Sequence, residues 1–139
     1  MDIKCNLILD SCCDLPHDVV NRDGVYLLNF PYFDNEGEHL DDLYQTQSAH
    51  DFFESMCNGN EPHTAQVPMP AIQKAYQWAI DQGVPTVYLS FSSGLSGTYD
   101  TAAMLLEQMK ADNPEIELYV VDTKLASVAE ALLVYEALN

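Results

Sequence analysis

The stretch "SSGLSG" (92–97) gathers small hydroxyl-bearing residues and glycines where an apolar run ends and a helical run begins. Ser92, Ser93 and Ser96 belong to it, and Thr98 follows it. Glycines let a backbone approach a ligand closely. The free N–H groups and the positive dipole end of a helix N-terminus favour a negatively charged group. The stretch therefore predicts a cradle for a carboxylate or a phosphate.

Two other interpretations of this stretch remain open, a serine nucleophile and a plain helix cap. The hydrolase pattern G-x-S-x-G is not matched, because Thr98 stands where the second glycine belongs. A hydrolase using Ser96 or Ser93 would also need a histidine as base, and any of the four histidines could come near, although spacing requires none of them to do so. These are His17, His39, His50 and His63. A phosphate loop of the P-loop type is disfavoured, because no lysine follows either glycine.

Neither the acidic residues nor the cysteines form a recognisable metal pattern, so we expect no metal and no cofactor. One acidic cluster is predicted to be a solvated loop. Its residues are Glu36, Glu38, His39, Asp41 and Asp42. The adjacent Cys12 and Cys13 could indicate redox chemistry, but no basic neighbour is visible to lower a thiol pKa. They are therefore predicted to form a packed turn with reduced thiols. The aromatic residues of "VYLLNFPYF" (25–33) are predicted to serve the core.

Strand and helix patterns alternate along the chain, which predicts an α/β fold: a mostly parallel sheet with helices on both faces. A polar loop is expected at 35–47. Ser48, with Asp51 as its capping-box partner, is expected to begin a helix that ends at Gly59. The strands are expected at 5–10, 25–34, 86–91 and 116–122, and the remaining helices at 15–24, 70–83, 97–112 and 125–138.

Ligands of open α/β sheets bind beyond the carboxyl ends of the strands. Three predicted loops leave strands at that edge, 10–14, 92–97 and 122–127, and all three carry hydroxyl or carboxylate groups. Because parallel strands end at the same rim, these loops are expected to lie together. "SSGLSG" is the richest of them and is therefore the leading site candidate.

The composition limits the classes of partner that the chain can bind. The chain has 139 residues, enough for a single domain with its own core, and a formal net charge of -17. This charge argues against binding to nucleic acid or to an anionic membrane surface. No apolar stretch approaches the roughly 20 residues of a membrane helix, and the N-terminal residues lack the pattern of a signal peptide. A cytoplasmic protein with reduced cysteines is expected.

Four short motifs, taken together, resemble the N-terminal part of the DegV family, bacterial proteins that bind a single fatty acid. They match in order and spacing from about residue 5 onward, and "SSGLSGTY" is the most specific of them. The motifs are "LDSCCDLP" (9–16), "HTAQVPMP" (63–70), "SSGLSGTY" (92–99) and "VVDT" (120–123).

The resemblance implies a carrier rather than an enzyme. By analogy with the family, Thr64 and Ser96 would hold the carboxylate of a long-chain fatty acid, with the N–H group of Gly97 assisting. Ser93 and Ser11, which stand in two of the matched motifs, complete the predicted site. The family passes its fatty acid to a fatty-acid kinase, which is the implied protein partner.

Three departures from the family pattern qualify this expectation. Ala65 replaces a common serine and removes one hydroxyl. After Asp122 the family usually has small glycines near the helix start, whereas this chain has Ala129 and Ala131. Family members are also about twice as long, so the second domain that buries the acyl tail is expected to be absent, whether the chain is a fragment, a truncated paralogue or half of a split protein. We therefore expect weak or absent fatty-acid binding by this chain alone, and an exposed apolar face that drives self-association. A third alternative is an interaction domain that has lost its ligand.

Overall fold

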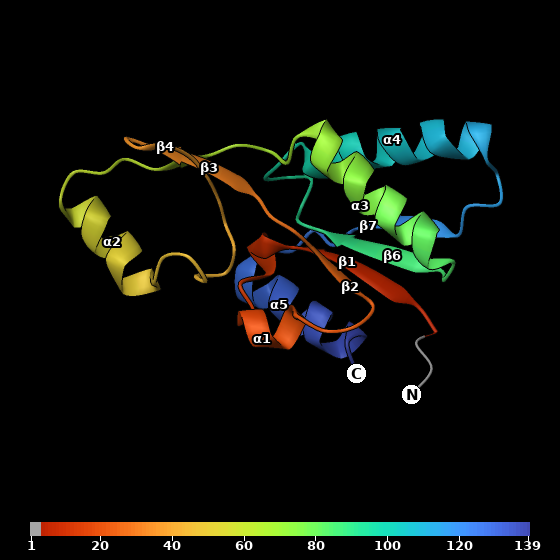
Figure 1. Ribbon diagram of the computed structural model, residues 1–139, viewed down its shortest axis with the longest axis horizontal. Helices are drawn as coiled ribbons and strands as arrows, with labels where there is room; N and C mark the ends of the chain where they lie inside the picture. The colour runs from red at the N-terminus through yellow and green to blue at the C-terminus, as the bar shows by residue number, and fades with distance from the viewer. Residues whose placement is uncertain (1–3) are drawn as a thin grey trace.

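A four-stranded parallel sheet forms the centre of the computed structural model, which describes residues 4–139 (Figure 1). Its strand order is β2-β1-β6-β7, so the central strand β1 pairs with both β2 and β6. Every residue of β1 is buried, as expected for a parallel strand covered on both faces. The strands are β1 (Asn6–Asp10), β2 (Val25–Leu28), β6 (Thr86–Ser90) and β7 (Leu118–Asp122).

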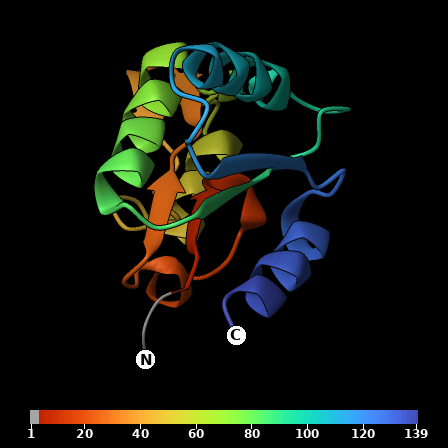
Figure 2. The same ribbon diagram turned by 90° about the vertical axis from the view of Figure 1, so that its right-hand side faces the viewer.

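Helices cover both faces of this sheet, which confirms the predicted α/β class (Figure 2). On one face lie α3 (Met69–Gln82) and α4 (Thr98–Asp112), and their apolar residues pack against Ile8 and Tyr88 of the sheet. On the other face lie α1 (His17–Val20) and α5 (Ser127–Ala137), which pack against Leu7 and Leu9. The alternation of side chains along β1 therefore serves two separate apolar clusters.

The helix ends follow from local sequence signals. Gly83 ends α3 with φ of 63°, a left-handed conformation that glycine adopts without steric cost. Ser48 begins α2 (Ala49–Cys57), and its hydroxyl oxygen accepts a hydrogen bond from Asp51 N, as predicted from the capping pattern. In the described part of the chain, no helix is long and apolar enough to cross a membrane.

A second, smaller sheet was not predicted. It is antiparallel with the order β4-β3-β5, and it extends with α2 to one side of the parallel sheet (Figure 1). Its strands are β3 (Pro31–Asp34), β4 (Gly37–Leu40) and β5 (His63–Thr64). The expectation of a polar loop at 35–47 was wrong for β4, because residues 37–40 pair with β3 across a tight turn.

Two other predicted elements differ from the expectation. The single extended stretch predicted at 25–34 is divided into β2 and β3, which belong to different sheets. The helix predicted at 15–24 is limited to the four residues of α1. Its span is short because Asp14 is left-handed before it and Gly24, with φ of 77°, turns the chain into β2 after it.

Candidate functional site

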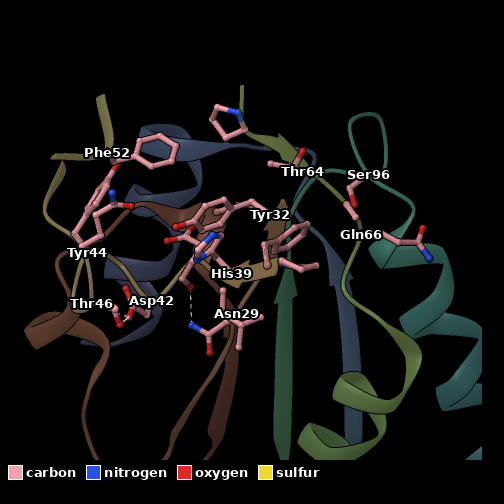
Figure 3. Close-up of a pocket in the computed structure, with 18 of the residues that line it drawn as sticks. Asn29, Tyr32, His39, Asp42, Tyr44, Thr46, Phe52, Thr64, Gln66 and Ser96 are labelled. Carbon is pink, nitrogen blue, oxygen red and sulfur yellow. Dashed lines mark hydrogen bonds between the residues drawn. The ribbon is translucent and has the colours of Figure 1, made fainter. Parts of the chain in front are cut away.

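A groove of about 1200 Å³ runs along the carboxyl rim of the parallel sheet and is also lined by the small sheet and α2 (Figure 3). Small-molecule sites in proteins commonly measure roughly 300–1,000 Å³. The volume is therefore sufficient for an extended ligand. On the rim side the lining residues include Phe30, Thr64, Phe91, Leu95, Ser96 and Gly97. On the opposite side they include Tyr32, His39, Leu40, Tyr44, Phe52 and Phe53.

The groove lies at the switch point of the sheet. After β1 the chain adds β2 on one side, and it later adds β6 on the other side. The loops that follow β1 and β6 therefore diverge, which opens a crevice at their carboxyl ends. Cys12 from the first loop lines the groove, as do Phe91, Leu95, Ser96 and Gly97 from the second.

A buried carboxylate fixes the position where the second loop leaves the sheet. Asp10 Oδ2, at the end of β1, accepts hydrogen bonds from Phe91 N at 2.7 Å and from the Tyr88 hydroxyl at 3.2 Å. The end of β6 is thereby tied to the end of β1. The predicted proximity of these two loops is confirmed by this contact.

Thr64 and Ser96 come from distant parts of the sequence and line the same side of the groove (Figure 3). Thr64 is the last residue of β5 and pairs with Tyr32 of β3. Three residues later, Val67 N donates to Thr98 Oγ1 at 3.1 Å, which joins this segment to the first turn of α4. The strand pairing and this buried contact together hold Thr64 beside the loop that carries Ser96.

Gly97 lies against the Gln66 side chain of the same neighbouring segment. A Cβ atom at Gly97 would clash with Gln66 Oε1, so a larger residue there would force this flexible side chain to move. Gln66 Nε2 in turn contacts Thr101 Oγ1 at 3.4 Å, and its side chain points away from the groove toward α4 (Figure 3). Gln66 thus packs the Thr64 segment against α4.

This side of the groove presents uncharged hydrogen-bond donors. Gly97 precedes α4, and no described residue accepts a hydrogen bond from its N–H group. The Thr64 side chain is exposed, and its hydroxyl is likewise without a partner among residues 4–139. Donors at the N-terminus of a 15-residue helix suit an anionic group.

The opposite side is aromatic and acidic. Tyr32 lies at its centre, stacked on His39 at 5.0 Å and in edge contact with Phe52 at 5.7 Å. Among the 25–33 aromatics, Phe30 is buried in the core and Tyr26 packs against it, whereas Tyr32 lines the groove, so the prediction that these aromatics serve the core was incomplete for Tyr32. Within the described residues the lining contains Glu36, Asp41 and Asp42 but neither lysine nor arginine.

The acidic cluster is only partly the solvated loop that was expected. Glu36 and Glu38 are exposed, in agreement with the expectation. Asp42 accepts hydrogen bonds from Gln45 N and Thr46 N, which shapes the turn before α2. Burial raises the pKa of Asp41, whose carboxylate accepts a hydrogen bond from Leu43 N.

The other predicted hydroxyls are turned away from the groove. Ser93 is bonded through N–H and hydroxyl to Asp122 at the end of β7, which lowers the pKa of that carboxyl group. Ser11 is fully buried and accepts a hydrogen bond from Phe30 N at 3.0 Å. Ser92 accepts from Gly94 N, and Thr98 is fully buried. Thr64, Ser96 and Gly97 are the predicted site residues that the fold brings together along the groove.

The hydrolase and redox interpretations gain no geometric support from the described residues. Among residues 4–139, neither Ser96 nor Ser93 is hydrogen-bonded to a histidine ring. Cys12 and Cys13 form a short 3-10 turn, as predicted. Burial raises the pKa of the Cys12 thiol far above its ordinary range, and the charges of Asp10 and Glu130 raise it further.

The aromatic side of the groove was missed because its elements are short. One signal was present: Asn35 and Gly37, both of which are residue types common in turns, follow the extended stretch "PYFD". Asp34 Oδ1 accepts from Glu36 N at 2.8 Å and so closes this turn. No local pattern marks the two-residue strand β5, which forms only because Thr64 pairs with Tyr32.

Comparison with known proteins matches both the sequence and the fold. The family model described as "Uncharacterised protein, DegV family" matches residues 4–139. A DegV domain-containing protein of Clostridium perfringens is 30% identical over 131 residues, which cover 94% of this chain and 45% of the relative. This chain thus spans about half the length of the curated relatives it matches.

Solved structures show the same architecture. A DegV family protein from Thermus thermophilus, described with fatty-acid binding, superposes with a TM-score of 0.81 at 25% identity, over 98% of this chain and 46% of that one. A DegV lipid-binding protein from Thermotoga maritima superposes with a TM-score of 0.79 at 25% identity, over 98% and 47%. The family model, the relative and these folds agree, and the chain belongs to the DegV family.

Proposed function

We propose that this chain binds a long-chain fatty acid, with the carboxylate at Thr64, Ser96 and Gly97 and the acyl chain along the groove. The observation that carries the proposal is the convergence of uncharged donors from two distant segments on one side of a large, aromatic groove. The fatty-acid and lipid binding described for the two solved DegV structures supports the same ligand class. A ligand with an anionic head and an apolar tail fits both features.

The aromatic side supplies the stabilisation for the tail. Burial of each CH₂ group contributes about 0.8 kcal/mol, so a tail that lies against Tyr32 and Phe52 gains more than the head group alone. The groove is bounded here by half of a DegV-length protein. We therefore expect this chain to bind more weakly than a DegV protein of full length.

The binding experiment uses titration of the purified chain with stearic acid, followed by native mass spectrometry. Hydrogen bonds to a charged group contribute roughly 1.5–3 kcal/mol, so Ser96→Ala or Thr64→Ala is expected to weaken binding about tenfold to hundredfold. Ser55→Ala is the matched control, because this hydroxyl lies on α2 outside the groove lining. Equal affinity of all four proteins would contradict the proposed site.

The same variants distinguish a carrier from a small serine hydrolase. With a p-nitrophenyl ester as substrate, a carrier shows the same background rate before and after Ser96→Ala. A hydrolase that used Ser96 as its nucleophile would lose its activity by orders of magnitude. Failure of the purified chain to bind stearic acid at any concentration tested would instead favour an interaction domain without a lipid ligand.

Presentation of the bound acid to a fatty-acid kinase is the second part of the proposal. The kinase would transfer the γ-phosphoryl group of ATP to a carboxylate oxygen, forming an acyl phosphate and ADP. Leu95, 68% exposed at the tip of the loop beside Ser96, offers an apolar contact next to the carboxylate end of the groove. Trapping of the acyl phosphate with hydroxylamine, in the presence of a fatty-acid kinase, tests this step. Loss of the product in Ser96→Ala is the expected result.

A further inference from the structure

The hydroxyl groups of Ser96 and Thr98 form a small hydrogen-bond network with two backbone N–H groups. Val67 N donates to Thr98 Oγ1 at 3.1 Å. Thr98 Oγ1 lies 2.9 Å from Ser96 Oγ, and Thr98 N donates to the same Ser96 oxygen at 3.2 Å. Thr98 is fully buried, whereas Ser96 is half-buried and lines the groove.

The direction of the hydrogen bond between the two hydroxyls follows from this network. An N–H group can only donate, so Thr98 Oγ1 is the acceptor for Val67. The hydroxyl hydrogen of Thr98 must also be bonded, because a buried donor without a partner is costly. Within residues 4–139 the only acceptor that Thr98 Oγ1 contacts is Ser96 Oγ. Thr98 therefore donates to Ser96.

This direction determines what Ser96 can offer to a ligand. Its oxygen accepts two hydrogen bonds, one from the Thr98 hydroxyl and one from Thr98 N. A hydroxyl oxygen has two lone pairs, so both are occupied and only the Ser96 hydrogen remains. The N–H group of Gly97 beside it is also a donor. Both groups therefore require an acceptor on the ligand.

We propose that Thr98 is a specificity-determining residue that makes Ser96 an obligatory hydrogen donor, so that the groove selects an ionised carboxylate over an alcohol of the same length. A carboxylate has only acceptor sites and matches both donors, whereas the hydroxyl hydrogen of an alcohol finds no acceptor on Ser96. Thr98 acts through Ser96 and does not touch the ligand itself. The part of this inference that concerns lipids rests on the proposed function.

The lipid experiment compares stearic acid with octadecanol in the wild-type chain and in Thr98→Val. Valine keeps the shape of threonine but leaves a lone pair of Ser96 free, which allows Ser96 to accept from an alcohol. The ratio of acid to alcohol affinity is expected to fall about fivefold, the equivalent of one net hydrogen bond. Thr98→Ser retains the hydroxyl and is the matched control, with the wild-type ratio. Circular dichroism and thermal melting confirm that each variant is folded at the assay temperature.

A purely structural role of Thr98 gives a different pattern. Loss of packing would weaken acid and alcohol equally and leave their ratio unchanged, which would overturn the inference. The Ser96→Ala background provides a second check. If Thr98 acts through Ser96, adding Thr98→Val to Ser96→Ala produces no further change in the ratio. A further fivefold fall in the double variant would also overturn the inference.

A measurement without ligand separates this inference from the proposed function. In proton NMR of the ligand-free chain, the Thr98 hydroxyl hydrogen is expected to exchange slowly and to show a contact with the β-hydrogens of Ser96. A protected Ser96 hydroxyl hydrogen, with no signal from the Thr98 hydroxyl, would overturn the inference whatever the lipid affinities are. If the Thr98 signal is present and neither lipid binds, the donor direction stands and the fatty-acid function fails.

Discussion

At the residue scale, Glu130 of α5 is a carboxyl group without access to water. Its side chain is fully buried, and no described residue donates a hydrogen bond to either of its oxygens. Burial raises its pKa well above the ordinary value, and the neighbouring charge of Asp10 raises it further. Burial also raises the pKa of Asp10, although the hydrogen bond from Phe91 N opposes the shift. Protonation of one carboxyl group removes the like-charge repulsion between them.

The raised pKa of Glu130 predicts that stability decreases with pH. Unfolded Glu130 loses its proton near 4.5, while the folded chain retains it to higher pH. Above this value the unfolded state binds fewer protons, so the free energy of unfolding falls as pH rises toward and through neutrality. Glu130→Gln removes the titration and is expected to flatten the dependence of the melting temperature on pH.

Glu136→Gln is the control for that measurement, because Glu136 is exposed on the same helix. It makes the same chemical change at a side chain outside the buried pair. The other titratable groups that interact electrostatically with Glu130 are Asp14, Cys12 and Cys13, and both variants retain them. If the melting temperatures of wild type and Glu130→Gln changed with pH in the same way, the carboxyl pair would not titrate in the expected range.

At the scale of elements, the aromatic side of the groove depends on α2, which contributes no fully buried residue. The helix is held by its cap and by contacts such as that of Phe52 with Tyr32. Two hydrogen bonds cap its N-terminus: Ser48 Oγ accepts from Asp51 N at 3.1 Å and donates to Asp51 Oδ2 at 2.7 Å. Because few tertiary contacts stabilise α2, its cap has a large share in keeping the groove formed.

Ser48→Ala is expected to loosen α2 while the parallel sheet stays intact. Loss of an N-cap hydroxyl costs about 1 kcal/mol, which corresponds to a roughly fivefold increase in local opening. Hydrogen exchange is expected to accelerate by about that factor in α2 and to remain unchanged in β6. Ser48→Asp keeps a capping acceptor and should exchange like wild type. Uniform acceleration across both elements would mean that α2 unfolds only with the whole domain.

At the scale of the whole molecule, the outer side of α5 is apolar and uncovered. Val128, Leu132 and Tyr135 are 71%, 66% and 53% exposed, and their spacing places them on one side of the helix. Tyr119 of the edge strand β7 is 52% exposed as well. In Figures 1 and 2, no other element of the described chain lies outside α5. Exposed apolar surface of this kind is typical of an interface.

We expect this α5 face to mediate self-association of the isolated chain. Val128→Glu combined with Leu132→Glu places charge at its centre and is expected to weaken the dimer at least tenfold in sedimentation velocity. The control Met69→Glu with Met104→Glu adds the same charge on α3 and α4, at two methionines that are each 42% exposed. A wild-type chain that is monomeric at every concentration tested would contradict the expectation.

The sequence by itself determined the parallel sheet, its helices and the leading site loop. The amphipathic run at 70–83, the capping pattern at Ser48 and the apolar strands are local signals, and each formed the expected element. Thr64, Ser96 and Gly97 were predicted as site residues because their motifs resemble a known family, and all three line the groove. What these signals share is that the residues that decide them are close together in the chain.

Only the tertiary structure decided which hydroxyls face the groove and what lies opposite them. Ser93 and Ser96 are three positions apart in one loop, yet Ser93 is bonded to Asp122 from another strand while Ser96 faces the groove. The buried role of Thr98 depends on Val67, which is 31 positions away. Strand β5 exists only through its pairing with β3. Contacts between distant segments carry no local pattern, because their energy appears only once the fold brings both partners together.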